Sequence, residues 1–139
     1  MTKPSIALVE ARFDIKIGSP TYQSRQVDIE AVLAAGGLPV LLPTAIPFVE
    51  VPALTAQFDG FYFTGGGDLD PLLFAEQSHE RVYGVDPERD AFELALIREV
   101  VARDKLLLAV YRRMQTLNVV CPLPFVQTNE MWATPIHCR

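Results

Sequence analysis

Cysteine and histidine are scarce in this chain. The two cysteines, Cys121 and Cys138, lie near its end, and the two histidines are His79 and His137. No CxxC pair and no His/Cys cluster has the spacing of a zinc site, so we expect neither a metal nor a cofactor. Cysteines placed only near the end cannot cross-link the rest of the fold, and we expect Cys121 to be a buried, reduced thiol.

Long apolar runs and clusters of like charge are also missing. No segment approaches the ~20 consecutive apolar residues of a membrane helix, and the short apolar run in residues 1–14 is too small for a signal peptide. We therefore expect a cytoplasmic protein that does not bind membranes. The net charge is −5, and no Lys/Arg cluster indicates a nucleic-acid partner.

What the chain does have is a regular alternation of apolar runs and helix-like segments. Half of its 139 residues are hydrophobic, enough for the core of one domain. We expect strands at 5–9, 39–43, 61–64 and 106–110, and helices at 21–35, 86–105 and 114–121. Residues 51–58 suit one or two helical turns, and residues 71–85 look irregular. Apolar strands that alternate with helices predict an α/β, flavodoxin-like fold, a parallel sheet with helices on both faces.

The expected helices differ in how clearly their ends are marked. The first has its apolar positions one turn apart, at Ile29, Val32 and Leu33, and Gly36–Gly37 would end it. The helix after residue 85 has the strongest start signal, with Asp86 as the N-cap and Pro87 at the first helical position. Its apolar face is Phe92, Leu96 and Val100. We expect its polar residues Arg89, Asp90 and Glu93 to lie on a solvated face.

Residues 121–139 break this alternation. The segment contains three prolines and shows no clear period, and Pro122 and Pro124 would end the preceding helix. We therefore divide the chain into a partial α/β domain, residues 1–120, and an atypical Pro-rich tail, residues 121–139, which is not expected to be native core.

Two turns could carry chemistry. Gly65–Gly67 follow a predicted strand, and ligands of open parallel sheets bind beyond the carboxyl ends of the strands. Glycines let backbone N–H groups approach an anion, although a tight turn that needs positive φ is the preferred explanation when the glycines are taken alone. Neither GxGxxG nor GxxxxGK[ST] is present, which disfavours a nucleotide.

The second turn, within residues 106–120, has the strand–turn–helix form of a nucleophile elbow. Tyr111 stands at the turn, with Ala109 two residues before it and Arg113 two residues after. An elbow needs small residues at both of these flanking positions. A phenol, with a pKa of about 10, is a poor acyl-transfer nucleophile at neutral pH. An ordinary turn with a surface tyrosine is the alternative.

Four sequence blocks resemble the gamma-glutamyl-gamma-aminobutyrate hydrolases of the class I glutamine amidotransferase-like superfamily. They are AAGGLPVLLP (34–43), DG (59–60) with TGGGDLDP (64–71), DPERDAFE (86–93), and residues 108–119, which match the pattern L-G-I-C-R-G-M-Q-x-L-N-V in part. The resemblance covers residues 5–120. It implies the N-terminal part of a class I glutamine amidotransferase-like domain.

The resemblance also implies a reaction and a site. Members of the family cleave a gamma-glutamyl amide with a Cys–His–Glu triad, through a gamma-glutamyl thioester that water hydrolyses. By position the nucleophile falls at Tyr111, and the oxyanion hole at the N–H groups of Gly66 or Gly67 and of Arg112. Gln115 would lie near the glutamyl group. The implied ligand is a small gamma-glutamyl compound or glutamate.

The departures from the family pattern concentrate at the elbow. Ala109, Tyr111 and Arg113 replace glycine, cysteine and glycine, and the family's His and Glu belong to a C-terminal portion not represented here. Because a triad acts as a unit, we predict a truncated, inactive member of the family. The alternatives are a pseudoenzyme that binds a small acid near Gly66 or pairs with itself as a homodimer, and an anion-binding flavodoxin-like domain of other function.

Overall fold

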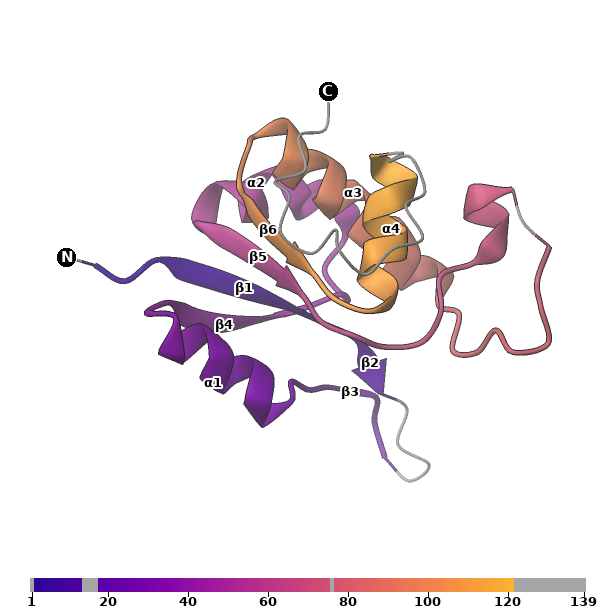
Figure 1. Ribbon diagram of the computed structural model, residues 1–139, viewed down its shortest axis with the longest axis horizontal. Coiled ribbons are helices and arrows are strands. Elements are labelled where there is room, and N and C mark those ends of the chain that lie inside the picture. The colour runs from indigo at the N-terminus through magenta and orange to yellow at the C-terminus, as the bar shows by residue number, and fades with distance from the viewer. Residues whose placement is uncertain (1, 14–17, 76, 122–139) are drawn as a thin grey trace, which may run out of the picture.

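A parallel sheet forms the centre of the molecule. The computed structural model describes residues 2–13, 18–75 and 77–121. Within these residues the sheet has four strands, in the order β4–β1–β5–β6 (Figure 1). The strands are β1 (Ser5–Glu10), β4 (Leu38–Pro43), β5 (Gly60–Phe63) and β6 (Leu106–Ala109). The strands therefore lie where the sequence predicts them, to within one or two residues at each end.

Helices cover both faces of the sheet. The helices are α1 (Gln26–Ala34), α2 (Val51–Gln57), α3 (Pro87–Ala102) and α4 (Arg112–Val120), with 3₁₀ turns at Phe48–Glu50 and Pro71–Phe74. Helix α1 lies on one face, and α2, α3 and α4 lie on the other (Figure 1). This arrangement confirms the predicted α/β fold. No helix in the described part of the chain is long and apolar enough to cross a membrane.

The core follows the strand register. Leu8 and Tyr62 are register partners and pack with Val32 beneath α1. Their neighbours along the strands point to the opposite face, where Phe61 and Phe63 pack against α2 and α3. The two faces are not equally covered, since α1 is the only described helix on its side.

Two predictions about the helices are wrong. The helix expected at 21–35 begins at residue 26, because Thr21–Tyr22 form a short strand, β3, paired antiparallel with β2 (Arg12–Phe13). The face of α1 that turns inward also differs. Val32 is buried as expected, but Asp28 is buried as well and Leu33 is exposed.

The solvated face expected on α3 is instead part of the interior. Arg89, Asp90 and Glu93 are all buried. Arg113 from α4 contacts Glu93, and the Asp90 carboxylate accepts a hydrogen bond from the Asp70 backbone N–H at 3.1 Å. Charged residues in the first turns of α3 thus face protein because α4 and the segment before Pro71 pack on this side.

The described part of the chain ends at Cys121. Cys121 is buried, as expected, but it is disulfide-bonded and not a free thiol. The tail from Pro122 onward, including His137, lies outside the described residues.

Candidate functional site at the carboxyl edge of the sheet

The glycine turn and the elbow turn meet at the carboxyl edge of the sheet. Strands β5 and β6 are parallel neighbours, with Phe63 opposite Ala109. The Val110 N–H donates to the Phe63 carbonyl at 3.3 Å. A Cβ atom on Gly65 would lie 3.5 Å from the Tyr111 ring. The structure therefore brings together the two turns that the sequence marks as candidates for chemistry.

Tyr111 occupies the turn between β6 and α4 in a strained conformation. Its φ is 54° and its ψ is −128°, a combination that residues with a side chain rarely adopt. The chain folds back at once, since the Met114 N–H donates to the Tyr111 carbonyl at 3.1 Å. The side chain is 68% exposed. The backbone thus has the sharp, outward-pointing form of a nucleophile elbow, with a phenol in place of a reactive group.

A hydrogen-bonded network lies beside Tyr111. The Arg25 guanidinium is 5.9 Å from the centre of the Tyr111 ring, and it donates two bonds of 2.8 Å to Asp28. The Tyr62 hydroxyl donates to the same carboxylate at 2.7 Å. Burial raises the pKa of Asp28, but the bonds from Arg25 and Tyr62 outweigh it and hold the pKa below its usual value. Burial and the Asp28 bond raise the pKa of Tyr62 to about 12.

The glycine turn is closely packed. A Cβ on Gly66 would lie 2.6 Å from Nη2 of Arg89, and a Cβ on Gly67 would collide with the backbone of Gly84. Asp68 fixes the end of the turn, because its N–H donates to the Tyr83 carbonyl at 2.7 Å and its carboxylate accepts from the Tyr83 N–H at 3.1 Å. Glycine is therefore required here by close approach of other groups.

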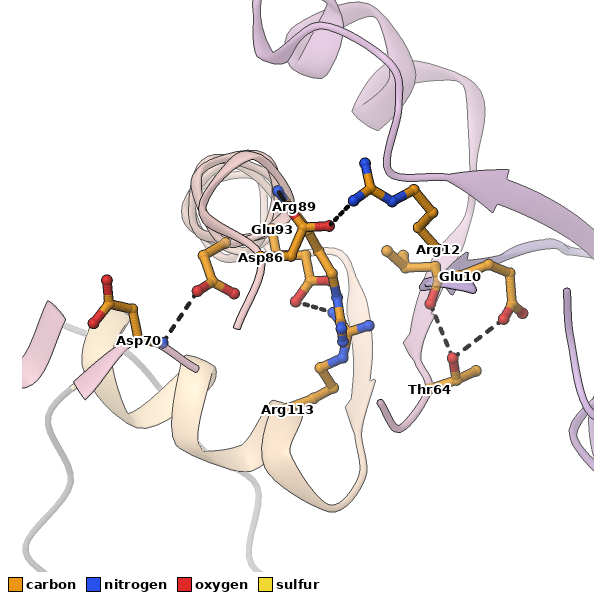
Figure 2. A network of polar contacts seen from close by, with 10 residues as sticks. Glu10, Arg12, Thr64, Asp70, Asp86, Arg89, Glu93 and Arg113 are labelled. Carbon is orange, nitrogen blue, oxygen red and sulfur yellow. Dashed lines mark hydrogen bonds and ion pairs between the residues drawn. The ribbon is translucent and has the colours of Figure 1, made fainter. Parts of the chain in front are cut away.

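Beneath the two turns lies a cluster of buried charges, shown in Figure 2. Glu93 accepts a bond of 2.8 Å from Arg89 Nε and also forms an ion pair with Arg113. Both arginine side chains and the carboxylate are almost completely inaccessible to water. Burial lowers the pKa of Arg113 well below its usual value, and the positive charge of Arg89 acts in the same direction. The residue that replaces the second elbow glycine thus points into the protein and not into the turn.

Glu10 is a further buried acid at this edge. It ends β1 and receives a weak hydrogen bond of 3.4 Å from the Thr64 hydroxyl, which also donates to the Val9 carbonyl at 3.0 Å (Figure 2). Its Oε1 atom has no hydrogen-bond partner among the described residues. Burial raises the pKa of Glu10 above its usual value. Sequence reasoning did not single out this residue.

Gln115 reaches a cavity that the sequence did not predict. The cavity measures about 210 Å³, and Gln115 lines it together with Asp68, His79 and Arg81. His79 is exposed and belongs to this wall, and its Nδ1 accepts a hydrogen bond of 3.2 Å from the Arg81 N–H. The cavity joins the elbow helix to the end of the glycine turn.

Of the remaining predicted site residues, Arg112 is the first residue of α4, next to Tyr111. Its backbone N–H thus belongs to the positive end of the helix dipole. Among the described residues, no group of three or more His, Cys, Asp or Glu side chains could hold a metal ion.

The comparisons with known proteins agree with this geometry. The family model of peptidase C26 matches residues 10–127. The chain belongs to the peptidase C26 family. This membership confirms the resemblance to gamma-glutamyl-gamma-aminobutyrate hydrolases that the four sequence blocks indicate.

Individual relatives of this peptidase C26 chain fall in the same group. It is 39% identical over 106 residues to Protein NtpR of Enterococcus hirae, a match that covers 72% of this chain and 44% of the relative. It is 33% identical over 121 residues to the gamma-glutamyl-gamma-aminobutyrate hydrolase of Escherichia coli O157:H7, covering 86% of this chain and 46% of the relative. The chain therefore spans less than half the length of these curated relatives.

Proposed function

We propose that this chain is the N-terminal portion of a gamma-glutamyl-gamma-aminobutyrate hydrolase-like protein and that the polypeptide is inactive as written. The observation that carries the proposal is Tyr111 at the strained turn between β6 and α4. The family reaction needs a thiolate there to form a gamma-glutamyl thioester. A phenol cannot form that thioester. The site therefore lacks a nucleophile, although the backbone has the shape of an elbow.

In this proposal, four other residues would bind the gamma-glutamyl ligand. Gly66 and Gly67 follow Gly65, which lies against the Tyr111 ring, and the Arg112 N–H would complete an oxyanion hole with one of them. Gln115 lines the adjoining cavity, where a glutamyl group would lie. We regard these four as vestigial substrate-binding residues, able to hold glutamate or a small gamma-glutamyl compound without cleaving it.

The proposal is tested by following the release of gamma-aminobutyrate from gamma-glutamyl-gamma-aminobutyrate. We expect no release above the buffer rate, and turnover by the unaltered chain would contradict the proposal. Tyr111→Cys should also fail to turn over, because a new thiol alone does not supply the histidine and the glutamate with which the family's triad acts as a unit. Tyr111→Phe is the matched control, since it keeps the ring and should behave like the unaltered chain.

A second candidate function is that of a pseudoenzyme that associates with itself. Two large apolar side chains of the edge strand β6 support it, since Leu106 is 71% exposed and Leu108 is 56% exposed. Both lie on the α1 face of the sheet, in register with Gly60 and Tyr62. An apolar strand at a sheet edge invites pairing with another chain.

A further inference from the structure

A second cavity lies away from the elbow, between the β2–β3 pair, the loop after β4 and the start of α3. It measures about 290 Å³. The polar residues that line it are Arg12, Tyr22, Thr44, Asp86, Glu88 and Arg89. It shares no lining residue with the cavity of Gln115, and it includes neither Tyr111 nor a glycine of the turn. The two cavities are therefore distinct sites.

The wall of this cavity carries two positive and two negative side chains. Arg12 and Asp86 are a loose pair, with Nη2 and Oδ2 4.0 Å apart (Figure 2). Glu88 is exposed at the start of α3, and Arg89 is only 4% exposed. The four charged side chains line the cavity and leave its volume open.

Arg89 is the buried charged residue of this wall. Its Nε bonds Glu93, but its Nη2 is buried and has no hydrogen-bond partner among the described residues. An unpaired buried guanidinium nitrogen is costly, and a carboxylate is the acceptor that an arginine binds most strongly. The same guanidinium lies against Gly66 of the glycine turn.

The mixture of charges selects the class of ligand. A simple anion would be repelled by Asp86 and Glu88, and a simple cation by Arg12 and Arg89. A molecule with one carboxylate and one ammonium group satisfies both pairs. The volume, at the lower limit for ligand pockets, restricts that molecule to a small one.

We infer that this cavity binds a small zwitterionic α-amino acid, with its carboxylate toward Arg12 and Arg89 and its ammonium group toward Asp86 and Glu88. The hydroxyl groups of Tyr22 and Thr44 supply further polar contacts. The inference does not depend on the proposed function, because it uses no residue of the elbow and no bond cleavage.

The test uses L-glutamine and two analogues that each lack one of its charges. Glutaramic acid lacks the ammonium group, and 4-aminobutanamide lacks the carboxylate. Each is added to the ¹⁵N-labelled full chain, and the backbone amide signals are followed by NMR. We expect glutamine to shift the amides of Tyr22, Thr44 and Glu88 in a saturable way, and each analogue to bind at least about tenfold more weakly, the usual effect of losing a hydrogen bond to a charged group.

Two charge-neutral variants locate the site. Arg12→Gln and Glu88→Gln should each weaken glutamine binding about tenfold. Both positions are exposed enough to leave the fold intact, which an unchanged spectrum of the free variant will verify. Glu99→Gln is the matched control, since Glu99 pairs with Arg103 at the other end of α3 and should leave binding unchanged.

Three results would overturn the inference. The first is the absence of any saturable shift with millimolar glutamine. The second is an analogue that binds as tightly as glutamine, which would show that one of the two charges is not recognised. The third is unchanged affinity in both Arg12→Gln and Glu88→Gln.

Discussion

Arg113 of α4 and Glu93 of α3 form an ion pair in which both side chains are completely buried. Glu93 is shared, because Arg89 binds its other oxygen from one turn earlier on α3. One carboxylate thus faces two arginines in the interior, where a charge that is not fully compensated lowers the free energy of unfolding. The family pattern has a glycine at the position of Arg113. Arg113 is therefore the residue that this chain adds to the Arg89–Glu93 pair.

The first prediction is that Arg113→Met stabilises the protein. The substitution removes a buried cation whose guanidinium makes no hydrogen bond among the described residues, and the Arg89–Glu93 pair remains. We expect the free energy of unfolding to rise by about 1–2 kcal/mol in urea denaturation. Arg103→Met is the control, because its exposed pair with Glu99 should contribute less than ~1 kcal/mol. A stability loss at Arg113 larger than at Arg103 would contradict the prediction.

The second prediction concerns the shared carboxylate. Glu93→Gln keeps the volume of the side chain but removes the carboxylate charge that both buried arginines contact. We expect the free energy of unfolding to fall by about 3 kcal/mol or more. The double variant Glu93→Gln with Arg113→Met should recover part of this loss. If the double variant is no more stable than Glu93→Gln alone, the two charges are not coupled as the structure indicates.

The fold could be predicted from the sequence because its strands are short apolar runs bounded by glycine, proline and charged residues. The start of α3 was also predictable, since Asp86 caps it by accepting the Arg89 N–H at 3.2 Å. The start of α1 was not, because the pairing of β3 with β2 replaces its expected first turn, and such pairing depends on segments distant in the chain.

The polar interior was not predictable for a related reason. Arg89, Asp90 and Glu93 read as a solvated helix face because periodicity shows only the apolar side of a helix. Their burial depends on α4, which packs across α3 and brings Arg113 against Glu93. The two turns at the site were found because glycines and a strand–helix junction mark them locally. The cavities were missed because their walls come from segments far apart in the sequence.

The third prediction tests the strain at Tyr111. Its φ and ψ fall where glycine is tolerated and other residues are not, at a cost of about 1–3 kcal/mol. Tyr111→Gly should therefore be more stable than Tyr111→Ala by about 1 kcal/mol, measured by denaturant unfolding. Comparing the two small variants removes the effect of losing the ring and its contact with Arg25.

The same comparison on α3 supplies the control. At the exposed helix position Arg98, outside any strained turn, alanine should be the more stable residue by about 1 kcal/mol, the usual order within a helix. If alanine is also preferred at position 111, the elbow is not strained in solution.

The fourth prediction is a pH dependence from Glu10. Because burial raises the pKa of Glu10 above its ordinary value of 4.5, the ionised form costs stability in the folded protein. That cost is fully present above the folded pKa and disappears as the pH falls through the folded pKa toward 4.5, since the folded state takes up the proton first. Glu10→Gln should therefore raise the free energy of unfolding at neutral pH by about 1 kcal/mol, which is measured as a higher melting temperature. The effect should be smaller near pH 4.5. Glu30→Gln on exposed α1 is the control, and an equal benefit of Glu10→Gln at both pH values would contradict the prediction.

The fifth prediction concerns the uncovered part of the α1 face. Leu106 and Leu108 project from the edge strand β6 with more than half of each side chain accessible. If this strip pairs two copies of the chain, light scattering after gel filtration should show a dimer fraction that grows with concentration. Leu106→Lys should abolish the dimer, because a charge on an edge strand opposes pairing. Leu72→Lys, at an equally exposed leucine in the Pro71–Phe74 turn, is the matched control and should leave the dimer intact. A monomer at every concentration would remove self-association as a function of this surface, and loss of the dimer in both variants would place the contact elsewhere.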